Sequence, residues 1–219
     1  MSASSHHPNR RKLILGSLGA SVLLAAGCSK TSSSKVRTLP KEATILCLGD
    51  SLTFGYGATP ETAYPAQLER LTGHVTQNAG RNGDMAQGAL ARLPALLQEN
   101  KPGLVLVSIG GNDFLRRLAP EQTKTALTQL VQTAAANTQV ALIAQPRPVL
   151  MAAAMGSLDD HEVYSEVAKE TGVPLFADGW SHVLSRAELR SDQIHANAEG
   201  YRVFAEQLAA WLRKMKFVA

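Results

Sequence analysis

Residues 44–51 read Thr-Ile-Leu-Cys-Leu-Gly-Asp-Ser, an apolar run that ends in a glycine, an aspartate and a serine. An unbroken run of this kind is typical of a strand that is buried on both faces in the middle of a parallel sheet. We expect Cys47, inside the run, to be a small buried hydrophobic side chain. A glycine directly after such a strand lets the chain turn sharply. The stretch therefore predicts a central strand whose carboxyl end carries Ser51.

Short apolar runs and amphipathic segments alternate over the rest of the chain. The predicted strands are residues 44–48, 75–78, 104–109, 140–144 and 174–176, and the predicted helices are residues 64–71, 85–99, 121–136, 161–170 and 197–216. Strands that alternate with helices form parallel sheets with helices on both faces. We therefore predict an α/β fold, a three-layer α/β/α sandwich around a five-stranded parallel sheet of the flavodoxin-like kind.

The first 28 residues are typical of an export signal. Basic residues at 10–12 precede an apolar stretch of 14 residues at 13–26, and three small residues, 25–27, lead to Cys28. A helix of that length extends about 21 Å, less than the ~30 Å hydrocarbon core of a bilayer. The segment resembles a bacterial lipoprotein signal, which implies that residues 1–27 are removed and that Cys28 carries lipid. An uncleaved anchor or a buried helix is the alternative.

Cys28 also sets expectations for location and for disulfides. Ser29, where an aspartate would favour the inner membrane, favours an outer-membrane lipoprotein whose domain faces the periplasm. Residues 9–14 resemble a twin-arginine motif as well, so both the general and the twin-arginine export routes stay open. With Cys28 modified, Cys47 is the other cysteine of the chain, and no intrachain disulfide is expected.

Composition divides the chain at residue 43. Seven of the 22 Lys and Arg residues but only one of the 18 acidic residues precede Ala43, so the remainder carries a net charge of −2. The basic character of the whole chain therefore belongs to its start and does not indicate nucleic-acid binding. Residues 28–42 are rich in Ser, Thr and Lys without periodicity, which predicts a flexible tether. Residues 43–219 are expected to form the folded domain.

Polar residues follow three predicted strands at their carboxyl ends, where open parallel sheets place their sites. Ser51 follows the first strand, residues 79–84 (Ala-Gly-Arg-Asn-Gly-Asp) the second, and residues 110–113 (Gly-Gly-Asn-Asp) the third. A serine that opens a helix is a candidate nucleophile, and the Asn112 amide and glycine-rich backbone can donate to a negatively charged oxygen. Taken singly, Ser51 is equally suited to cap a helix, and the two glycine-rich segments to be ordinary turns.

One of the six histidines has a carboxylate at a useful spacing. Asp192 lies three residues before His195, which lets the carboxylate hold one ring nitrogen and fix the tautomer of the imidazole. A structural capping loop is the alternative for this pair. His161, between acidic neighbours, is expected to be a solvated helix entry, without the His-Glu-x-x-His spacing of a metal site. His6 and His7 lie in the export signal, and His74 precedes the second predicted strand, at the opposite edge of the sheet from its carboxyl end. No partner is evident for His182.

Together these residues resemble the SGNH (GDSL-type) hydrolase family over residues 44–219. The four marker residues of that family fall on Ser51, Gly83, Asn112 and His195, and Asp192 occupies its Asp-x-x-His position. The resemblance implies a serine hydrolase in which Asp192 and His195 activate Ser51. It also implies an oxyanion hole formed by Ser51 N–H, Gly83 N–H and the Asn112 side chain, with no metal or organic cofactor. A monomer is expected.

The substrate expectation comes from a closer resemblance. Residues 89–97 and 110–113 are similar to bacterial thioesterase I-type enzymes, which hydrolyse acyl thioesters, arylesters and lysophospholipids. This predicts a small-molecule ester or lipid substrate. Residues 149–160 do not align with the family and are expected to border the acyl pocket. A carbohydrate or peptidoglycan O-acetylesterase, or a non-catalytic envelope-binding lipoprotein, is the alternative.

Overall fold

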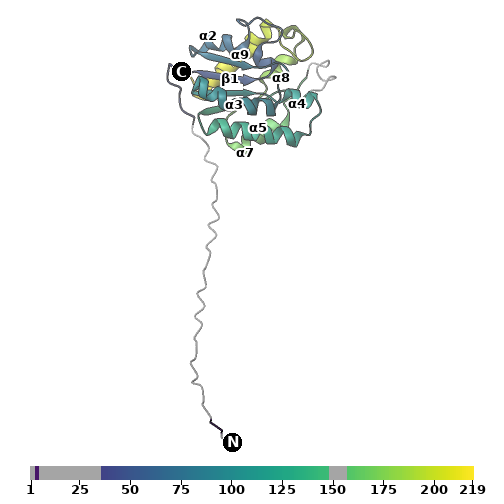
Figure 1. Cartoon of the computed structure of the whole chain (residues 1–219). Coiled ribbons are helices and arrows are strands. Elements are labelled where there is room, and N and C mark those ends of the chain that lie inside the picture. The colour runs from purple at the N-terminus through teal and green to yellow at the C-terminus, as the bar shows by residue number, and fades with distance from the viewer. Residues whose placement is uncertain (1–2, 5–35, 148–156) are drawn as a thin grey trace. The chain divides into compact units, whose positions relative to one another are not determined.

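A five-stranded parallel sheet lies at the centre of the computed structural model, which describes residues 3–4, 36–147 and 157–219 (Figure 1). The neighbouring strands of the sheet all run parallel, in the spatial order β2-β1-β3-β4-β5. The strands are β1 (Ile45–Gly49), β2 (Thr76–Gly80), β3 (Leu104–Ser108), β4 (Gln139–Ile143) and β5 (Leu175–Phe176). The predicted sheet is therefore confirmed, with strand ends that differ by at most two residues from the predicted ones.

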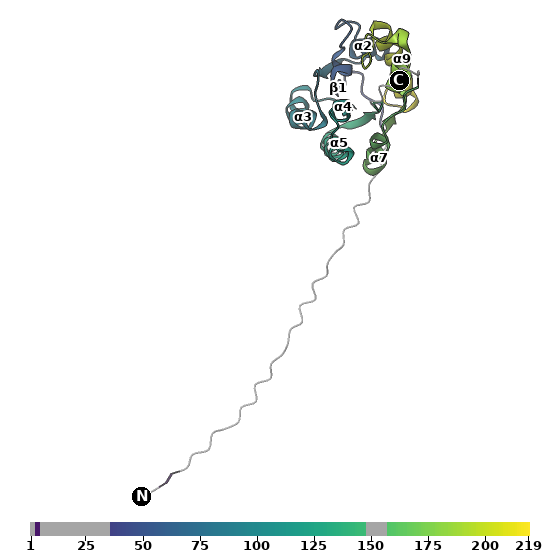
Figure 2. The same ribbon diagram turned by 90° about the vertical axis from the view of Figure 1, so that its right-hand side faces the viewer.

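Helices cover both faces of the sheet, which confirms the predicted three-layer sandwich (Figures 1 and 2). One face carries α3 (Ala86–Asn100), α5 (Pro120–Ala135) and α7 (Glu162–Thr171). The other carries α2 (Tyr64–Thr72), α8 (Gly179–Leu184) and α9 (Ala198–Lys214). Shorter elements follow β1, β3 and α8: α1 (Ser51–Phe54), α4 (Gly111–Leu115) and the 3₁₀ turn η1 (Ala187–Leu189).

The strands divide the core into two halves, because successive side chains of a strand point to opposite faces. Ile45 and Cys47 pack in the half beside α2, α8 and α9, whereas Leu46 and Leu48 pack in the half beside α3, α5 and α7. Burial on both faces explains the unbroken apolar sequence of β1. Cys47 is buried, as predicted, and burial raises the pKa of its thiol to about 12, so the thiol stays neutral and inert.

The folded domain begins earlier than the sequence indicates. Leu39 is buried, and its N–H donates to the carbonyl oxygen of Phe217 at 2.8 Å. Before it, the N–H of Arg37 donates to Oε1 of Gln139 at 2.7 Å. The end of the tether predicted over 28–42 therefore belongs to the domain. The reason is that the apolar side chains of Val36 and Leu39 and a few hydrogen bonds attach a segment whose overall composition is polar.

Some of the predictions concern residues that the structure does not describe. Apart from residues 3–4, the signal peptide predicted over residues 1–27 lies outside the described residues, as does the lipid-attachment residue Cys28. Residues 149–156, which make up most of the segment 149–160 expected to border the acyl pocket, lie outside them as well. In the part of the chain that the structure describes, no helix is long and apolar enough to cross a membrane.

Candidate active site

The carboxyl end of β1 places Ser51 at the edge of the sheet. Asp50 caps α1, because its Oδ1 accepts the backbone N–H of Leu52 at 3.0 Å, and Ser51 is the first residue of the helix. Asp50 rather than Ser51 is thus the N-cap, so the capping alternative for the serine is wrong. Gly49 is needed at the turn because a Cβ there would lie 2.4 Å from the carbonyl oxygen of Ser108 on β3.

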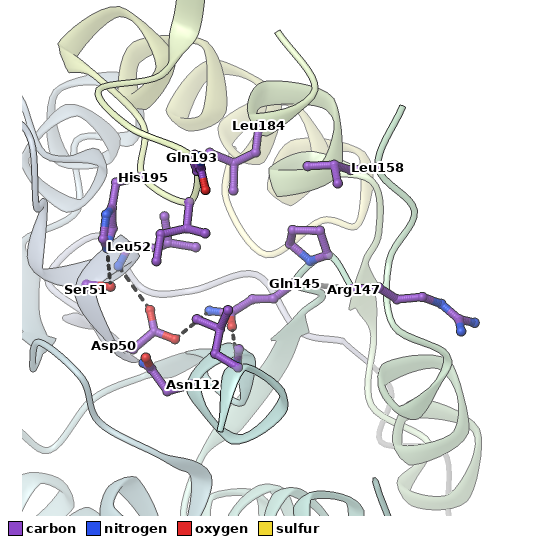
Figure 3. Close-up of a pocket in the computed structure, with 14 residues that line it drawn as sticks. Asp50, Ser51, Leu52, Asn112, Gln145, Arg147, Leu158, Leu184, Gln193 and His195 are labelled. Atoms are coloured by element: carbon purple, nitrogen blue, oxygen red, sulfur yellow. Dashed lines mark hydrogen bonds between the residues drawn. The ribbon is translucent and has the colours of Figure 1, made fainter. Parts of the chain in front are cut away.

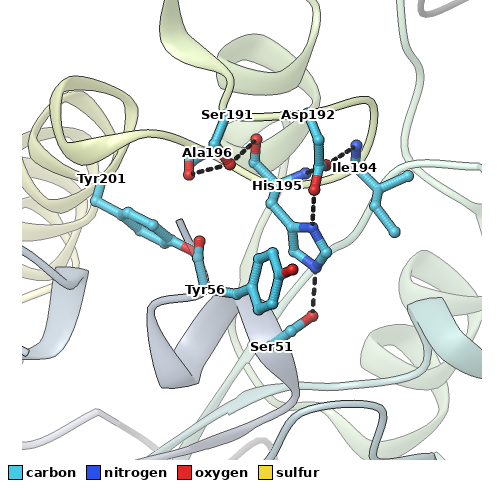
Figure 4. A network of polar contacts seen from close by, with 8 residues as sticks. All are labelled: Ser51, Tyr56, Ser191, Asp192, Ile194, His195, Ala196 and Tyr201. Carbon is cyan, nitrogen blue, oxygen red and sulfur yellow. Dashed lines mark hydrogen bonds and ion pairs between the residues drawn. The ribbon is translucent and has the colours of Figure 1, made fainter. Parts of the chain in front are cut away.

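Ser51, His195 and Asp192 form a continuous line of polar contacts (Figure 4). Nε2 of His195 lies 3.0 Å from Oγ of Ser51, and Nδ1 of the same ring lies 2.7 Å from Oδ2 of Asp192. The serine and the histidine are 144 residues apart in sequence, and the fold brings them together from α1 and from the loop before α9. This arrangement can transfer a proton from the hydroxyl to the imidazole.

Asp192 also accepts hydrogen bonds from the backbone of its own loop. Oδ1 of Asp192 accepts the N–H groups of Ile194 and His195, each at 2.8 Å. Burial raises the pKa of Asp192, but the hydrogen bonds from the His195 ring and from these two N–H groups outweigh burial and hold the pKa below its usual value. The ionised carboxylate is therefore suited to hold a proton on Nδ1 and to leave Nε2 free to accept from Ser51.

The ring of Tyr56, which no sequence motif marks, lies beside the imidazole. The rings of Tyr56 and His195 are 4.3 Å apart between centroids, with an angle of 36° between their planes (Figure 4). The hydroxyl of Tyr201, a buried residue of α9, donates to the carbonyl oxygen of Tyr56 at 2.9 Å. The imidazole is thus restrained by an aromatic ring as well as by its two polar partners.

Asn112 is held in place at the start of α4. Its Nδ2 donates to the carbonyl oxygen of Asp84 at 3.0 Å, which leaves the second amide hydrogen for another acceptor. The carboxylate of Asp84 in turn accepts from Nε of Arg92 at 2.9 Å. Gly83, the residue before Asp84, has a φ of 71°, in the left-handed region that favours glycine. The structure thus joins Asn112 to the turn that contains Gly83.

A pocket opens beside the reactive side chains (Figure 3). Its apolar walls come from α1, α4, α8 and the loops after β4 and before α9, and consist of Leu52, Leu115, Pro146, Leu158, Leu184 and Ile194. Ser51, Asn112 and His195 line one end of it, whereas Gly83 does not line it. Leu158 lies in the segment 149–160, so the described end of that segment borders the pocket as expected. An apolar pocket with a polar end suits an apolar substrate that reacts at one group.

Two buried polar residues at this site were not found from the sequence. Asp50 and Gln145 are 2% and 1% exposed, and Nε2 of Gln145 donates to Oδ2 of Asp50 at 3.0 Å. Burial raises the pKa of Asp50 to about 6, although hydrogen bonds from Gln145 and from Leu52 N–H act against burial. The sequence does carry an indication of Gln145, because it is a polar residue directly after the predicted strand 140–144, and Asp50 and Ser51 likewise follow the predicted strand 44–48.

His161 is not the solvated residue that its sequence neighbours indicated. Its ring stacks on that of Phe114, with 3.8 Å between centroids and 5° between planes, and its Nδ1 accepts the N–H of Val163 to cap α7. Burial lowers its pKa. The acidic sequence neighbours of His161 do not predict this contact, because Phe114 lies on a different helix, α4. No three His, Cys, Asp or Glu side chains within the described residues are arranged to hold a metal ion.

The sequence profile of the GDSL-like lipase/acylhydrolase family matches residues 47–203, which include Ser51, Asn112, Asp192 and His195. The chain belongs to this family. The resemblance that the sequence motifs indicated is therefore confirmed at the level of the family.

The relatives are esterases by name. Over 175 residues the chain is 35% identical to thioesterase 1/protease 1/lysophospholipase L1 of Escherichia coli K12, covering 78% of this chain and 84% of that protein. It is 30% identical to an arylesterase of Vibrio mimicus, with 78% and 88% covered. A crystal structure of TesA superposes with a TM-score of 0.70 at 30% identity, covering 78% of this chain and 99% of the other. This GDSL-family protein is therefore a serine esterase.

A further structural relative carries an inhibitor. The psychrotrophic esterase EstA from Pseudoalteromonas sp., in a crystal structure inhibited by monoethylphosphonate, superposes with a TM-score of 0.68 at 27% identity. The superposition covers 79% of this chain and 98% of EstA. The similarity thus spans nearly the whole of EstA and supports the same fold for the present esterase.

Proposed function

We propose that this esterase hydrolyses carboxylic esters or thioesters through an acyl-enzyme, with Ser51 as nucleophile, His195 as general base and Asp192 as the group that orients the ring. The observation that carries the proposal is the line from Ser51 Oγ through the imidazole to Asp192 Oδ2, with contacts of 3.0 and 2.7 Å. A serine hydroxyl is a weak nucleophile by itself and needs an adjacent base in this position.

In the first half-reaction, Oγ of Ser51 attacks the substrate carbonyl carbon while Nε2 of His195 takes the hydroxyl proton. The carbonyl electron pair moves onto oxygen, and Asp192 stabilises the imidazolium that forms. When the oxyanion collapses, the bond to the leaving alcohol or thiol breaks, and His195 gives its proton to that group. An ester between the acyl group and Ser51 remains.

In the second half-reaction, water takes the place of the alcohol. His195 removes a proton from the water, whose oxygen attacks the acyl carbon, and the same imidazole then returns the proton to Ser51 Oγ. The carboxylic acid leaves and the free enzyme is regenerated. The protein residues supply every proton transfer in this scheme.

The oxyanion is expected to accept hydrogen bonds from Ser51 N–H, Gly83 N–H and the second amide hydrogen of Asn112. The bond from Asn112 to the carbonyl oxygen of Asp84 restricts the amide before substrate binds. Donors that are fixed in advance need no reorganisation during the reaction, and removing one typically costs about 3–4 kcal/mol of transition-state stabilisation.

The pocket supports an acyl chain as the group next to the scissile bond. Its apolar walls start at Leu52, beside Ser51, and continue to Leu158 and Leu184 (Figure 3). We therefore propose acyl esters, acyl thioesters, arylesters or lysophospholipids as the substrate class. Hydrolysis rates measured with p-nitrophenyl esters from acetate to palmitate test this. A rate that is highest with acetate and falls with every added carbon would favour a carbohydrate or peptidoglycan O-acetylesterase instead.

We also propose that the enzyme is exported and anchored by lipid on Cys28 in the bacterial envelope, at the outer membrane and facing the periplasm. The support is the basic, apolar and small-residue order of residues 10–28. Cys28→Ser should move the enzyme from the membrane fraction to the soluble fraction with full activity. Retention of this variant in membranes would mean that residues 13–26 are an uncleaved anchor.

Substitution of the nucleophile tests the catalytic proposal. Ser51→Ala should abolish ester hydrolysis and labelling by a fluorophosphonate probe, while the free energy of unfolding changes by no more than about 1 kcal/mol. Ser165→Ala, at an exposed serine of α7, is the matched control and should keep both activities. Turnover by Ser51→Ala above a few per cent of wild type would contradict the role of Ser51. Wild-type protein that neither reacts with the probe nor hydrolyses esters would favour a non-catalytic envelope lipoprotein.

A further inference from the structure

The side chain of Gln145 connects the two short helices that carry the reactive groups. Its Nε2 donates to Oδ2 of Asp50, the cap of α1, at 3.0 Å, and its Oε1 accepts the N–H of Gly111, the first residue of α4, at 2.7 Å (Figure 3). Ser51 is the residue after Asp50, and Asn112 is the residue after Gly111. The buried amide of Gln145, at the end of β4, is thus hydrogen-bonded to the residue before the nucleophile and to the residue before the oxyanion donor.

The amide is itself fixed by a neighbouring strand. Its Nε2 lies 3.3 Å from Oγ of Ser108 on β3, and the same hydroxyl oxygen accepts from Nε1 of Trp180 at 3.1 Å. Gln145, Ser108 and Trp180 are all buried. The hydrogen bonds therefore connect the ends of β1, β3 and β4 with α8, and the side chain of Gln145 is not free to adopt another rotamer without breaking several of them.

We propose that Gln145 is a positioning residue that sets the spacing between the nucleophile Ser51 and the oxyanion donor Asn112, through Asp50 and Gly111. This proposal rests on the proposed function of those two residues. The attacking oxygen acts on the carbon of the substrate carbonyl group and the oxyanion donors act on its oxygen, so the separation of these protein groups is set by the geometry of that one group. Errors of about 1 Å in such placements can reduce the rate about 100-fold.

A glutamine is suited to position 145 because one of the two groups it binds is a hydrogen-bond donor and the other is an acceptor. Gly111 presents a donor, and the Asp50 carboxylate presents an acceptor. Leucine supplies neither partner, and glutamate supplies two acceptors. The charged groups that act on Asp50 are His195, which favours its ionised form, and Asp84, which opposes it. A second carboxylate, at position 145, would further disfavour the ionised form of Asp50, as the charge of Asp84 does.

The first test is Gln145→Leu, which keeps the volume and removes both hydrogen bonds. kcat for p-nitrophenyl butyrate should fall about 10- to 100-fold with KM within about threefold of wild type, because placement is lost at the transition state rather than in substrate binding. A rise in KM with unchanged kcat would overturn the proposal and make Gln145 a residue of the substrate pocket. Unchanged kcat and KM would overturn it as well.

The second test is Gln145→Glu, which keeps the shape and makes the link depend on a proton. Two adjacent carboxyl groups share one proton at acid pH, so the introduced carboxyl group can then donate to Asp50 and accept from Gly111. The ratio of variant to wild-type kcat should therefore fall as pH rises from about 5.5 to 9. A negative charge that acted only by stabilising the imidazolium of His195 would make this ratio rise with pH. A constant or rising ratio would overturn the proposal, and this variant keeps the test valid if Gln145→Leu does not fold.

Tyr164→Phe is the matched control. The hydroxyl of Tyr164 is also buried and donates to the carbonyl oxygen of Ile109 at 3.0 Å, close to α4, but it does not connect the two helices. This variant should keep kcat within about twofold, and an equal loss of kcat in it would overturn the special role of Gln145. Fluorophosphonate labelling distinguishes a failure of this proposal from a failure of the proposed function. Ser51→Ala should not be labelled if Ser51 is the nucleophile, whereas the Gln145 variants should still be labelled, only more slowly.

Discussion

Asp192 binds both the ring and the backbone of His195. Oδ2 lies 2.7 Å from Nδ1 of the imidazole, and Oδ1 accepts the backbone N–H of His195 at 2.8 Å. One carboxylate therefore fixes the position of the residue and the orientation of its side chain. This double attachment lets a half-exposed aspartate hold a largely buried imidazole. The same hydrogen bonds hold the pKa of Asp192 below its usual value despite partial burial.

Asp192→Asn should reduce kcat by orders of magnitude while the loop keeps its shape. The asparagine oxygen can still accept the backbone N–H groups, but its NH₂ group facing Nδ1 favours the wrong tautomer of the imidazole. Steady-state kinetics of Asp192→Asn, His195→Ala and the double variant measure the coupling. Because the two residues act as a unit, the double variant should lose little more activity than His195→Ala.

Two effects that simply multiply would show that Asp192 and His195 are not partners. Asp178, which follows the last predicted strand, is then the next candidate. In the structure Asp178 is the N-cap residue of α8 and its N–H donates to Oδ2 of Asp160, so its local contacts are with another part of the fold. Asp178→Asn is accordingly the control for the cycle and should leave kcat within about threefold.

Asn112→Ala should lower kcat by roughly 10²–10³ with KM little changed, because the amide is needed mainly when negative charge develops on the substrate oxygen. It should also lower the free energy of unfolding by about 1 kcal/mol, since the carbonyl oxygen of Asp84 loses its donor. Asn100→Ala removes a similar side-chain bond to the carbonyl of Leu96, and it should show the loss of stability without the loss of kcat. A rise in KM alone for Asn112→Ala would make this residue a substrate-positioning group.

Tyr56 should affect catalysis through its ring and not through its hydroxyl. The ring lies 4.3 Å from that of His195, so Tyr56→Phe should keep kcat within about twofold, and Tyr56→Ala should lower it about tenfold by freeing the imidazole. Phe54→Ala, at another exposed aromatic residue of the same segment, is the control. Equal activity of Tyr56→Ala and wild type would show that the stacking has no catalytic role.

The sequence predicts the sheet and the proposed catalytic residues because both depend on local patterns. Strands buried on both faces read as apolar runs, and their carboxyl ends mark Ser51 and Asn112 without reference to the rest of the chain. The Asp192–His195 pair is also local, since both residues lie in one short loop. Short helices such as α1 and α4 span too few turns to show a period of 3.6 residues, so their sequence gives no separate signal.

What the sequence does not show are contacts between residues far apart in the chain. The link from Gln145 to Asp50 spans 95 positions, and the stack of His161 on Phe114 joins two different helices. The domain boundary is missed for the same reason, because Leu39 is attached by a hydrogen bond to Phe217 near the other end of the chain. Each of these contacts depends on the tertiary fold, which periodicity alone does not specify.

The last prediction concerns the pH dependence that Asp50 gives to stability. Burial raises its pKa to about 6, whereas an aspartate in the unfolded chain titrates near about 4. Between these values the folded protein holds a proton that the unfolded chain has lost, so the contribution of Asp50 to the free energy of unfolding falls as pH rises through this window. The fall amounts to about 3 kcal/mol for two pK units.

Asp50→Asn removes this titration. The free energy of unfolding of the variant relative to wild type should therefore rise by about 2 kcal/mol between pH 4 and pH 7, as measured by urea denaturation at each pH. Other shifted carboxylates, such as Asp113 and Asp192, are present in both proteins and cancel in the comparison. A difference that does not vary with pH would contradict an ionisable, buried Asp50. The variant should nevertheless be less active at pH 7, because the asparagine NH₂ would face the NH₂ of Gln145, donor to donor, and the link between α1 and α4 would be lost.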